Sequence, residues 1–219
     1  MCWNENISLN TFLFSIMTLI FIYYNNEYTQ YKLDSFNNKY LYIFFISIIS
    51  MQLIEYFLWK SIKTKDKFLN WVFSIIGWLF IYIIQPISYL LLLPVKYSDV
   101  RNISATIYLL ILFIVSIYKY KYNPINFLTT VKNDHLYWNW MYVDNYEYIL
   151  YIFYFLFLLS VAINFPLLIL IIFIFFAYMY VFKNANWGSL WCWVTNSIFI
   201  YYLCKILFVL PFTEYNGLC

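Results

Sequence analysis

Few residues of this chain have the types and spacing to do chemistry, and the clearest group is Gln52 and Glu55 inside a long apolar run. Together with Trp59 they are spaced i, i+3 and i+7, which places all three on one face of a helix. A charge at the bilayer centre costs on the order of 2.5 to 3.5 kcal/mol, so an intramembrane carboxyl usually faces a protein interior and indicates function. The alternative is a carboxyl that reaches the membrane surface or hydrogen-bonds to a neighbouring helix.

A second group opens the last apolar run, where three tryptophans stand beside small polar residues between Trp187 and Asn196. At about 100° per residue, Gly188, Ser189, Cys192 and Asn196 share one side of the predicted helix. Small residues permit close approach of a second helix, and an asparagine can hydrogen-bond across the contact for about 0.6 to 2 kcal/mol. Helix packing and a functional site are both compatible with this pattern.

The depths of these residues link the two groups. From the nearer end of each predicted span, Glu55 lies roughly 7.5 Å deep, Gln52 roughly 12 Å and Asn196 roughly 13 Å. We therefore predict a shared polar patch of Gln52, Glu55, Ser189 and Asn196, which requires the second and last spans to be neighbours.

A further polar residue, Gln85, lies roughly 24 Å from the same side. It ends a stripe of Trp71, Ser74 and Trp78 at heptad-like spacing, and Pro86 beside it can kink the helix. Gln85 is expected to belong to a second polar layer or to a pathway.

The elements that must position these residues are membrane spans. Hydrophobic residues make up 65% of the 219 residues and charged residues 11%, whereas soluble domains carry roughly 25% charge. Seven apolar runs are long enough to cross a bilayer, and only Glu55 and Lys205 are charged within them. Because the runs lack strand-like alternation, we predict an all-α, polytopic bundle forming one domain over residues 1–219. The predicted spans are 7–24, 40–59, 69–93, 103–118, 148–163, 165–182 and 187–210.

The number of spans depends on the break between the fifth and sixth runs, at Asn164 to Pro166. Proline disfavours helix there, which favours a tight hairpin and seven spans; one kinked helix would leave six. With seven spans, one side carries eight lysines and the other carries three lysines and Arg101. The positive side normally stays cytoplasmic, so the N-terminus is expected in the cytoplasm and the C-terminus outside or in a lumen.

Several kinds of chemistry have no support in the sequence. A single histidine, His135, and four scattered cysteines give no metal-ligand spacing, and we find no catalytic constellation, no cofactor motif and no phosphate-binding loop. The net charge of +3 lies beside spans, where it orients the chain rather than binding nucleic acid. Lys205 is expected to extend to the membrane surface. The aromatic-rich loop from Lys119 to Glu147 is expected to lie at the headgroup level.

The run from Met51 to Trp59, with its Gln-x-x-Glu-x-x-x-Trp spacing, and the Trp-Gly-Ser-Leu-Trp-Cys-Trp segment from Trp187 resemble uncharacterised multi-pass membrane proteins of large DNA viruses. About twenty residues carry the resemblance. It implies a polytopic architecture and a viral source, with a host or virion membrane as the location, and it implies no activity.

Two main functional hypotheses follow. One is a small transporter, channel or ligand-sensing bundle that uses the polar patch to bind a small solute or ion. The other is a structural or partner-binding membrane protein for membrane remodelling or virion assembly, in which the polar groups pack helices against each other or against membrane-protein partners. A lipid-modifying enzyme has the least support.

Overall fold

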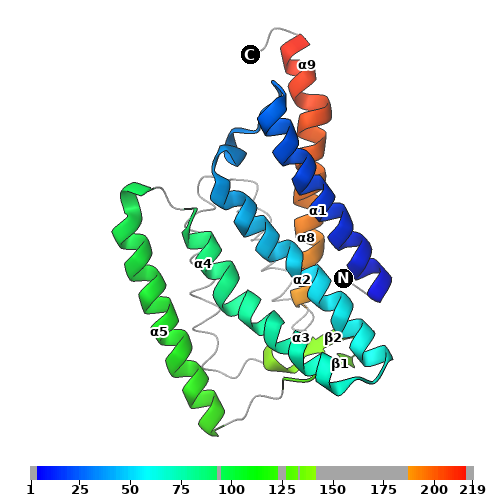
Figure 1. Cartoon of the computed structure of the whole chain (residues 1–219), viewed down its shortest axis with the longest axis vertical. Helices are drawn as coiled ribbons and strands as arrows, with labels where there is room; N and C mark the ends of the chain where they lie inside the picture. The colour runs from blue at the N-terminus through cyan, green and yellow to red at the C-terminus, as the bar shows by residue number, and fades with distance from the viewer. Residues whose placement is uncertain (1–3, 93–94, 123–126, 133, 142–186, 216–219) are drawn as a thin grey trace.

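The chain folds into a mostly helical bundle with one small β-hairpin, as seen in a computed structural model that describes residues 4–92, 95–122, 127–132, 134–141 and 187–215. Figure 1 shows the arrangement. The α-helices are α1 (Glu5–Tyr28), α2 (Lys39–Lys63), α3 (Lys67–Leu79), α4 (Gln85–Leu90), α5 (Ser98–Tyr122), α8 (Trp187–Cys204) and α9 (Leu210–Tyr215). The strands are β1 (Thr129–Lys132) and β2 (His135–Trp138). Short 3-10 turns lie at Asp34–Asn37, Val95–Tyr97 and Asn139–Met141, and π turns lie at Phe80–Ile84 and Lys205–Val209.

Five helical segments in the described ranges are long and apolar enough to cross a membrane. They are Glu5–Tyr28, Lys39–Lys63, Lys67–Leu90, Ser98–Tyr118 and Thr195–Thr213. Each overlaps one of the predicted spans, so the prediction of a helical, membrane-spanning architecture is confirmed to that extent. The two remaining predicted spans, 148–163 and 165–182, lie outside the described residues.

Polar residues just outside the apolar runs decide where the helices begin. The side chains of Asn4, Asn38 and Asp66 each accept a hydrogen bond from a backbone N–H in the first turn of α1, α2 and α3. Such capping satisfies a donor that the helix itself leaves unpaired. The helices therefore extend a few residues beyond the runs that hydropathy alone defines.

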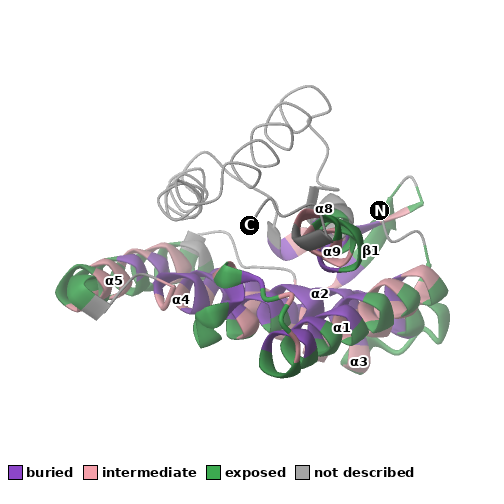
Figure 2. Cartoon of the chain, turned by 90° about the horizontal axis from the view of Figure 1, so that it is seen from above, coloured by how far each residue is buried: buried purple, intermediate pink, exposed green. Residues whose placement is uncertain are grey.

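The helix α2 is the centre of the bundle. It packs against α1, α3, α4 and α8, and Figure 2 shows α5, α4, α2 and α1 in a curved row with α8 on one side of it. Ile49 and Leu58 are buried on α2, as are Ile22 of α1 and Phe199 of α8. In contrast, α5 lies at the edge of the row and exposes most of its apolar side chains, as a helix facing lipid does.

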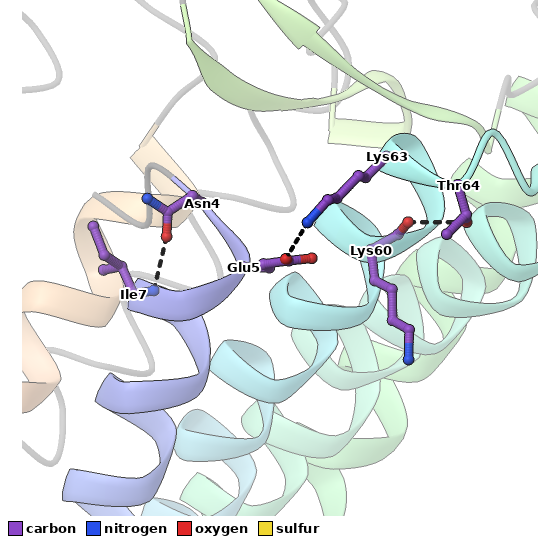
Figure 3. A network of polar contacts seen from close by, with 6 residues as sticks. All are labelled: Asn4, Glu5, Ile7, Lys60, Lys63 and Thr64. Carbon is purple, nitrogen blue, oxygen red and sulfur yellow. Dashed lines mark hydrogen bonds and ion pairs between the residues drawn. The ribbon is translucent and has the colours of Figure 1, made fainter.

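The bundle has two distinct ends. We call one the hairpin end; it holds Glu5, the turn between α2 and α3, and the β1–β2 hairpin (Figure 1). There the Lys63 Nζ lies 2.6 Å from the Glu5 Oε1, joining the last turn of α2 to the first turn of α1 (Figure 3). The Lys63 side chain is 71% exposed, so this ion pair contributes little stability.

At the opposite end, an asparagine fixes the chain after α1. The Asn26 Nδ2 donates to the Leu33 carbonyl at 3.0 Å, and the Leu33 N–H donates to the Asn26 Oδ1 at 2.9 Å. The side-chain amide of Asn26 thus bonds to both the N–H and the carbonyl of Leu33, as the backbone of a neighbouring β-strand would. Both residues are buried. This pairing holds the short connection to α2 against the bundle.

Each of the two π turns is followed directly by a short α-helix that has a proline at its second position. The N–H of Gln85 bonds to the Phe80 carbonyl, five residues back, and Pro86 follows. The N–H of Leu210 bonds to the Lys205 carbonyl in the same way, and Pro211 follows. Because proline has no N–H and crowds the preceding turn, the helix widens there.

The carbonyl that Pro86 cannot bond is that of Tyr82, four residues earlier. The Tyr108 hydroxyl of α5 donates to this carbonyl at 2.8 Å, and Tyr108 is almost fully buried. A side chain of α5 thereby replaces the missing helical hydrogen bond and fixes α5 against the α3–α4 segment.

Candidate functional site

Gln52 and Glu55 are fully buried inside the bundle. Both side chains have 0% exposure, because α2 is surrounded by α1, α3, α4 and α8. The helical spacing places the two residues one turn apart on the same face, as predicted. Trp59, which was expected to share that face, is only partly buried. The structure therefore places a carboxyl group and an amide inside the protein rather than toward lipid.

Asn196 is buried on α8 and bonds to α1. The Ser15 Oγ donates to the Asn196 Oδ1 at 3.0 Å, and Asn196 is 6% exposed. Ser15 lies ten residues after the start of α1 and Asn196 nine residues after the start of α8. Phe36, which follows the end of α1, packs on Tyr202 near the end of α8 at 4.9 Å between ring centroids. Early residues of the two helices are thus in contact, and so are residues near or beyond their ends. The helices α1 and α8 therefore run parallel.

The second and last predicted spans are neighbours, as the polar patch requires. The rings of Phe45 on α2 and Phe199 on α8 lie 5.1 Å apart, and α2 and α8 are in contact. Asn196 is thus on a helix adjacent to that of Gln52 and Glu55. The hydrogen bond to Ser15 shows that Asn196 also holds α8 to α1, which is the packing role considered above.

Gln85 belongs to a different layer. Its Nε2 donates to the Ser47 carbonyl of α2 at 3.4 Å, and the hydroxyls of Ser47 and Ser88 lie 3.2 Å apart. Ser47 precedes Gln52 by five residues, which corresponds to about 7.5 Å along the helix. Gln85 therefore joins α4 to α2 at a level about one and a half helical turns from Gln52. Whether it serves a second polar layer or a pathway, the two alternatives considered above, stays a prediction. Of the fifth predicted residue, Ser189, only the backbone position in α8 is described.

A third buried polar group was not predicted, and it attaches the hairpin to α3. The Asn70 Nδ2 donates to the Thr129 carbonyl at 3.0 Å, while the Thr129 N–H donates to the Asn70 Oδ1 at 2.8 Å. The Ser74 and Thr129 hydroxyls lie 2.7 Å apart. All three residues are buried. This is the same two-point amide pairing that Asn26 makes at the opposite end.

The hairpin also packs two tryptophans against the helices. Trp138 and Trp140 stack at 5.1 Å between ring centroids, with planes 9° apart, and both are buried. A Cβ added at Gly77 of α3 would lie 3.2 Å from the Trp140 Cζ2. The absence of a side chain at Gly77 therefore lets the indole lie directly on the helix.

These tryptophans belong to the loop from Lys119 to Glu147, whose location at the headgroup level stays a prediction. Trp138 and Trp140 are buried within the protein, so they do not act as exposed anchors. The all-α prediction is wrong at this point, because β1 and β2 form an antiparallel pair with Thr129 opposite Trp138. The sequence signal was the Asn133–Asp134 pair, two residue types that favour turns, between a β-branched and an aromatic segment. Asp134 has a φ of 59°, as such turns require.

No group of three histidine, cysteine, aspartate or glutamate residues in the described ranges is arranged to hold a metal ion. No protein-family model, curated protein or solved structure matches this chain.

Proposed function

We propose that this chain is a seven-span integral membrane protein of the transporter, channel or ligand-sensing class, in which Gln52 and Glu55 bind or respond to a small solute or ion. The observation that carries the proposal is a carboxyl-bearing side chain with 0% exposure on the central helix of an apolar bundle. A buried carboxyl lowers stability unless it is compensated, so its presence within membrane spans favours a functional role over packing.

The described residues on either side of 142–186 support seven spans over six. Tyr122 lies fourteen residues beyond Tyr108, and Lys67 lies fifteen residues before Tyr82, to whose carbonyl Tyr108 bonds. The end of α5 is therefore level with the start of α3, at the hairpin end. The start of α8 is level with that of α1, at the same end. The chain therefore leaves α5 and enters α8 on the same side of the membrane, which requires an even number of membrane crossings between the two helices. Two further spans meet this requirement and one does not.

The lysine distribution supports the proposed orientation. The hairpin end contains Lys60, Lys63, Lys65, Lys67 and Lys132, and α5 ends there after Lys121. With the positive side in the cytoplasm, the N-terminus is cytoplasmic and the C-terminus lies outside or in a lumen.

Flux measurements in proteoliposomes test the proposed role of Glu55. Glu55→Gln keeps the size of the side chain and removes its ionisable carboxyl group, so we expect loss of solute flux or of pH-dependent current. Glu27→Gln is the matched control, because it removes one carboxylate from an exposed position near the end of α1. Equal flux in wild type and Glu55→Gln, across a panel of small ions and solutes, would refute the assignment.

A second candidate function is a structural or partner-binding role in membrane remodelling or virion assembly. It is favoured by the direct interhelical hydrogen bonds of Asn196 with Ser15 and of Gln85 with the Ser47 carbonyl. If this role holds, Ser15→Ala reduces bundle stability and capture of cross-linked membrane partners, while Glu55→Gln leaves partner capture unchanged.

A further inference from the structure

The hairpin end carries an excess of basic side chains that the proposed function does not use. Lys65, Lys67 and Lys132 are exposed there. The acidic residues at this end are fewer than the lysines: Glu5 pairs with Lys63, the Asp66 Oδ1 accepts from the Leu69 N–H at 2.9 Å, and Asp134 lies in the hairpin turn.

The position of these lysines relative to the apolar surface is defined by two exposed aromatic residues. Phe68 is 74% exposed and Trp71 is 47% exposed, and their rings lie 6.4 Å apart with planes 27° apart. Both follow Lys67 within the first turns of α3. Exposed aromatic residues at the end of an apolar helix are typical of the boundary between hydrocarbon and headgroups. Lys65 and Lys67 therefore lie on the headgroup side of that boundary.

The hairpin adds Lys132 to the same end as part of a fixed structure. Asn70 pairs with both backbone groups of Thr129, and Trp140 lies on Gly77, so the segment from Thr129 to Trp140 is attached to α3 near both of its ends. Lys132, three residues after Thr129, is further ordered by the ring of Tyr137, whose centroid lies 3.6 Å from the Lys132 Nζ. A cation on a rigid hairpin loses less entropy on binding an anion than one on a free loop.

The opposite end lacks this excess. Its segments contain the basic residues Lys32, Lys39, Lys96 and Arg101 and the acidic residues Glu27, Asp34 and Asp99, which nearly balance. The charge asymmetry is therefore a property of the hairpin end alone among the described residues.

We infer that the hairpin end is a binding surface for anionic phospholipid headgroups, formed by Lys65, Lys67 and Lys132. The inference rests on the membrane insertion proposed above. Headgroup phosphates and carboxylates are the anions that lie at this depth beside any span, and each lysine near an anionic surface contributes roughly a fivefold preference.

The test compares lipid retention by full-length wild type and two charge-matched triple variants. The solubilised protein is equilibrated with micelles containing equal amounts of phosphatidylserine and phosphatidylcholine, and the lipid that stays bound through size exclusion is quantified by mass spectrometry. Wild type is expected to retain phosphatidylserine preferentially. The K65Q/K67Q/K132Q variant is expected to lose at least about fivefold of that preference. The K32Q/K39Q/K96Q variant removes the same charge at the opposite end, where Glu27, Asp34 and Asp99 already repel anionic headgroups, and is expected to change the ratio less than twofold.

Salt provides a second readout, because about 1 M NaCl shortens the screening length to roughly 3 Å and should abolish the wild-type preference. Equal retention of the two lipids by wild type would overturn the inference. The same loss in both triple variants would also overturn it. If the hairpin-end triple variant does not fold, Lys65→Gln and Lys132→Gln should each give part of the decrease. Glu55→Gln should keep the lipid preference, which separates this result from the flux experiment.

Discussion

Replacing Asn70 by alanine should release the hairpin from α3. The substitution removes both hydrogen bonds to Thr129 and leaves its N–H and carbonyl unpaired at a residue that is 3% exposed. Each unpaired buried group costs about 1 to 3 kcal/mol, and the better helix propensity of alanine returns roughly 0.6 kcal/mol. The expected net loss of stability is about 1.5 to 5 kcal/mol. Because the loss falls on the attachment of the hairpin, the hairpin should open locally while the helices stay folded.

Hydrogen–deuterium exchange of peptides covering residues 127–141 measures this opening directly. A loss of 1.5 kcal/mol or more corresponds to exchange accelerated about tenfold or more, while peptides from α1 and α2 should change little. Asn102→Ala is the matched control, since Asn102 is an exposed asparagine within α5 and the same propensity gain applies. If hairpin exchange in Asn70→Ala equals that of Asn102→Ala, the two-point pairing does not hold the hairpin, and the reasoning is wrong.

Three further predictions concern tertiary contacts of the bundle. Tyr108→Phe should destabilise the chain by about 1 to 3 kcal/mol, measured by thermal or denaturant unfolding. In a Pro86→Ala background, which restores a backbone donor for the Tyr82 carbonyl, the cost of Tyr108→Phe should be smaller. Equal costs in both backgrounds would show that the Tyr108 hydroxyl does not replace the missing helical hydrogen bond. Ser15→Ala should cost about 0.6 to 2 kcal/mol, measured by the same unfolding, and should cost nothing further once its partner on α8 is replaced by alanine. Gly77→Leu should displace the stacked tryptophans and expose them to a water-soluble fluorescence quencher, whereas unchanged quenching would show that the site accommodates a side chain.

The sequence was sufficient to predict the five described membrane-length helices because continuous apolar runs dominate it. The helix boundaries were less accurate, since they depend on capping side chains such as Asn38 and Asp66 rather than on hydropathy. The burial of Gln52 and Glu55 followed from the cost of exposing them to lipid, and it was predicted for that reason.

Other features depend on which helices meet, and hydropathy does not encode that. Nothing about Ser15 alone indicates a partner 181 residues away. A signal was present in α1, where Ser8, Ser15 and Ile22 recur every seven residues and are all buried. The hairpin was missed because its tryptophans were read as interfacial, although the Asn133–Asp134 pair is a turn signal in its own right.

The π turn at Phe80–Ile84 has a consequence for the length of the gene segment that encodes it. A π turn contains one residue more than an α-turn, which rotates the following helix by about 100° relative to an unbroken one. Asn70 and Gly77 before the turn contact the hairpin, while Gln85 after it contacts α2. Deletion of a single codon between Phe80 and Ile84 would leave each half of the helix foldable but would prevent both halves from meeting their partners at once. Length changes in this segment should therefore be tolerated only in compensating pairs, one residue lost and one regained within the same turn.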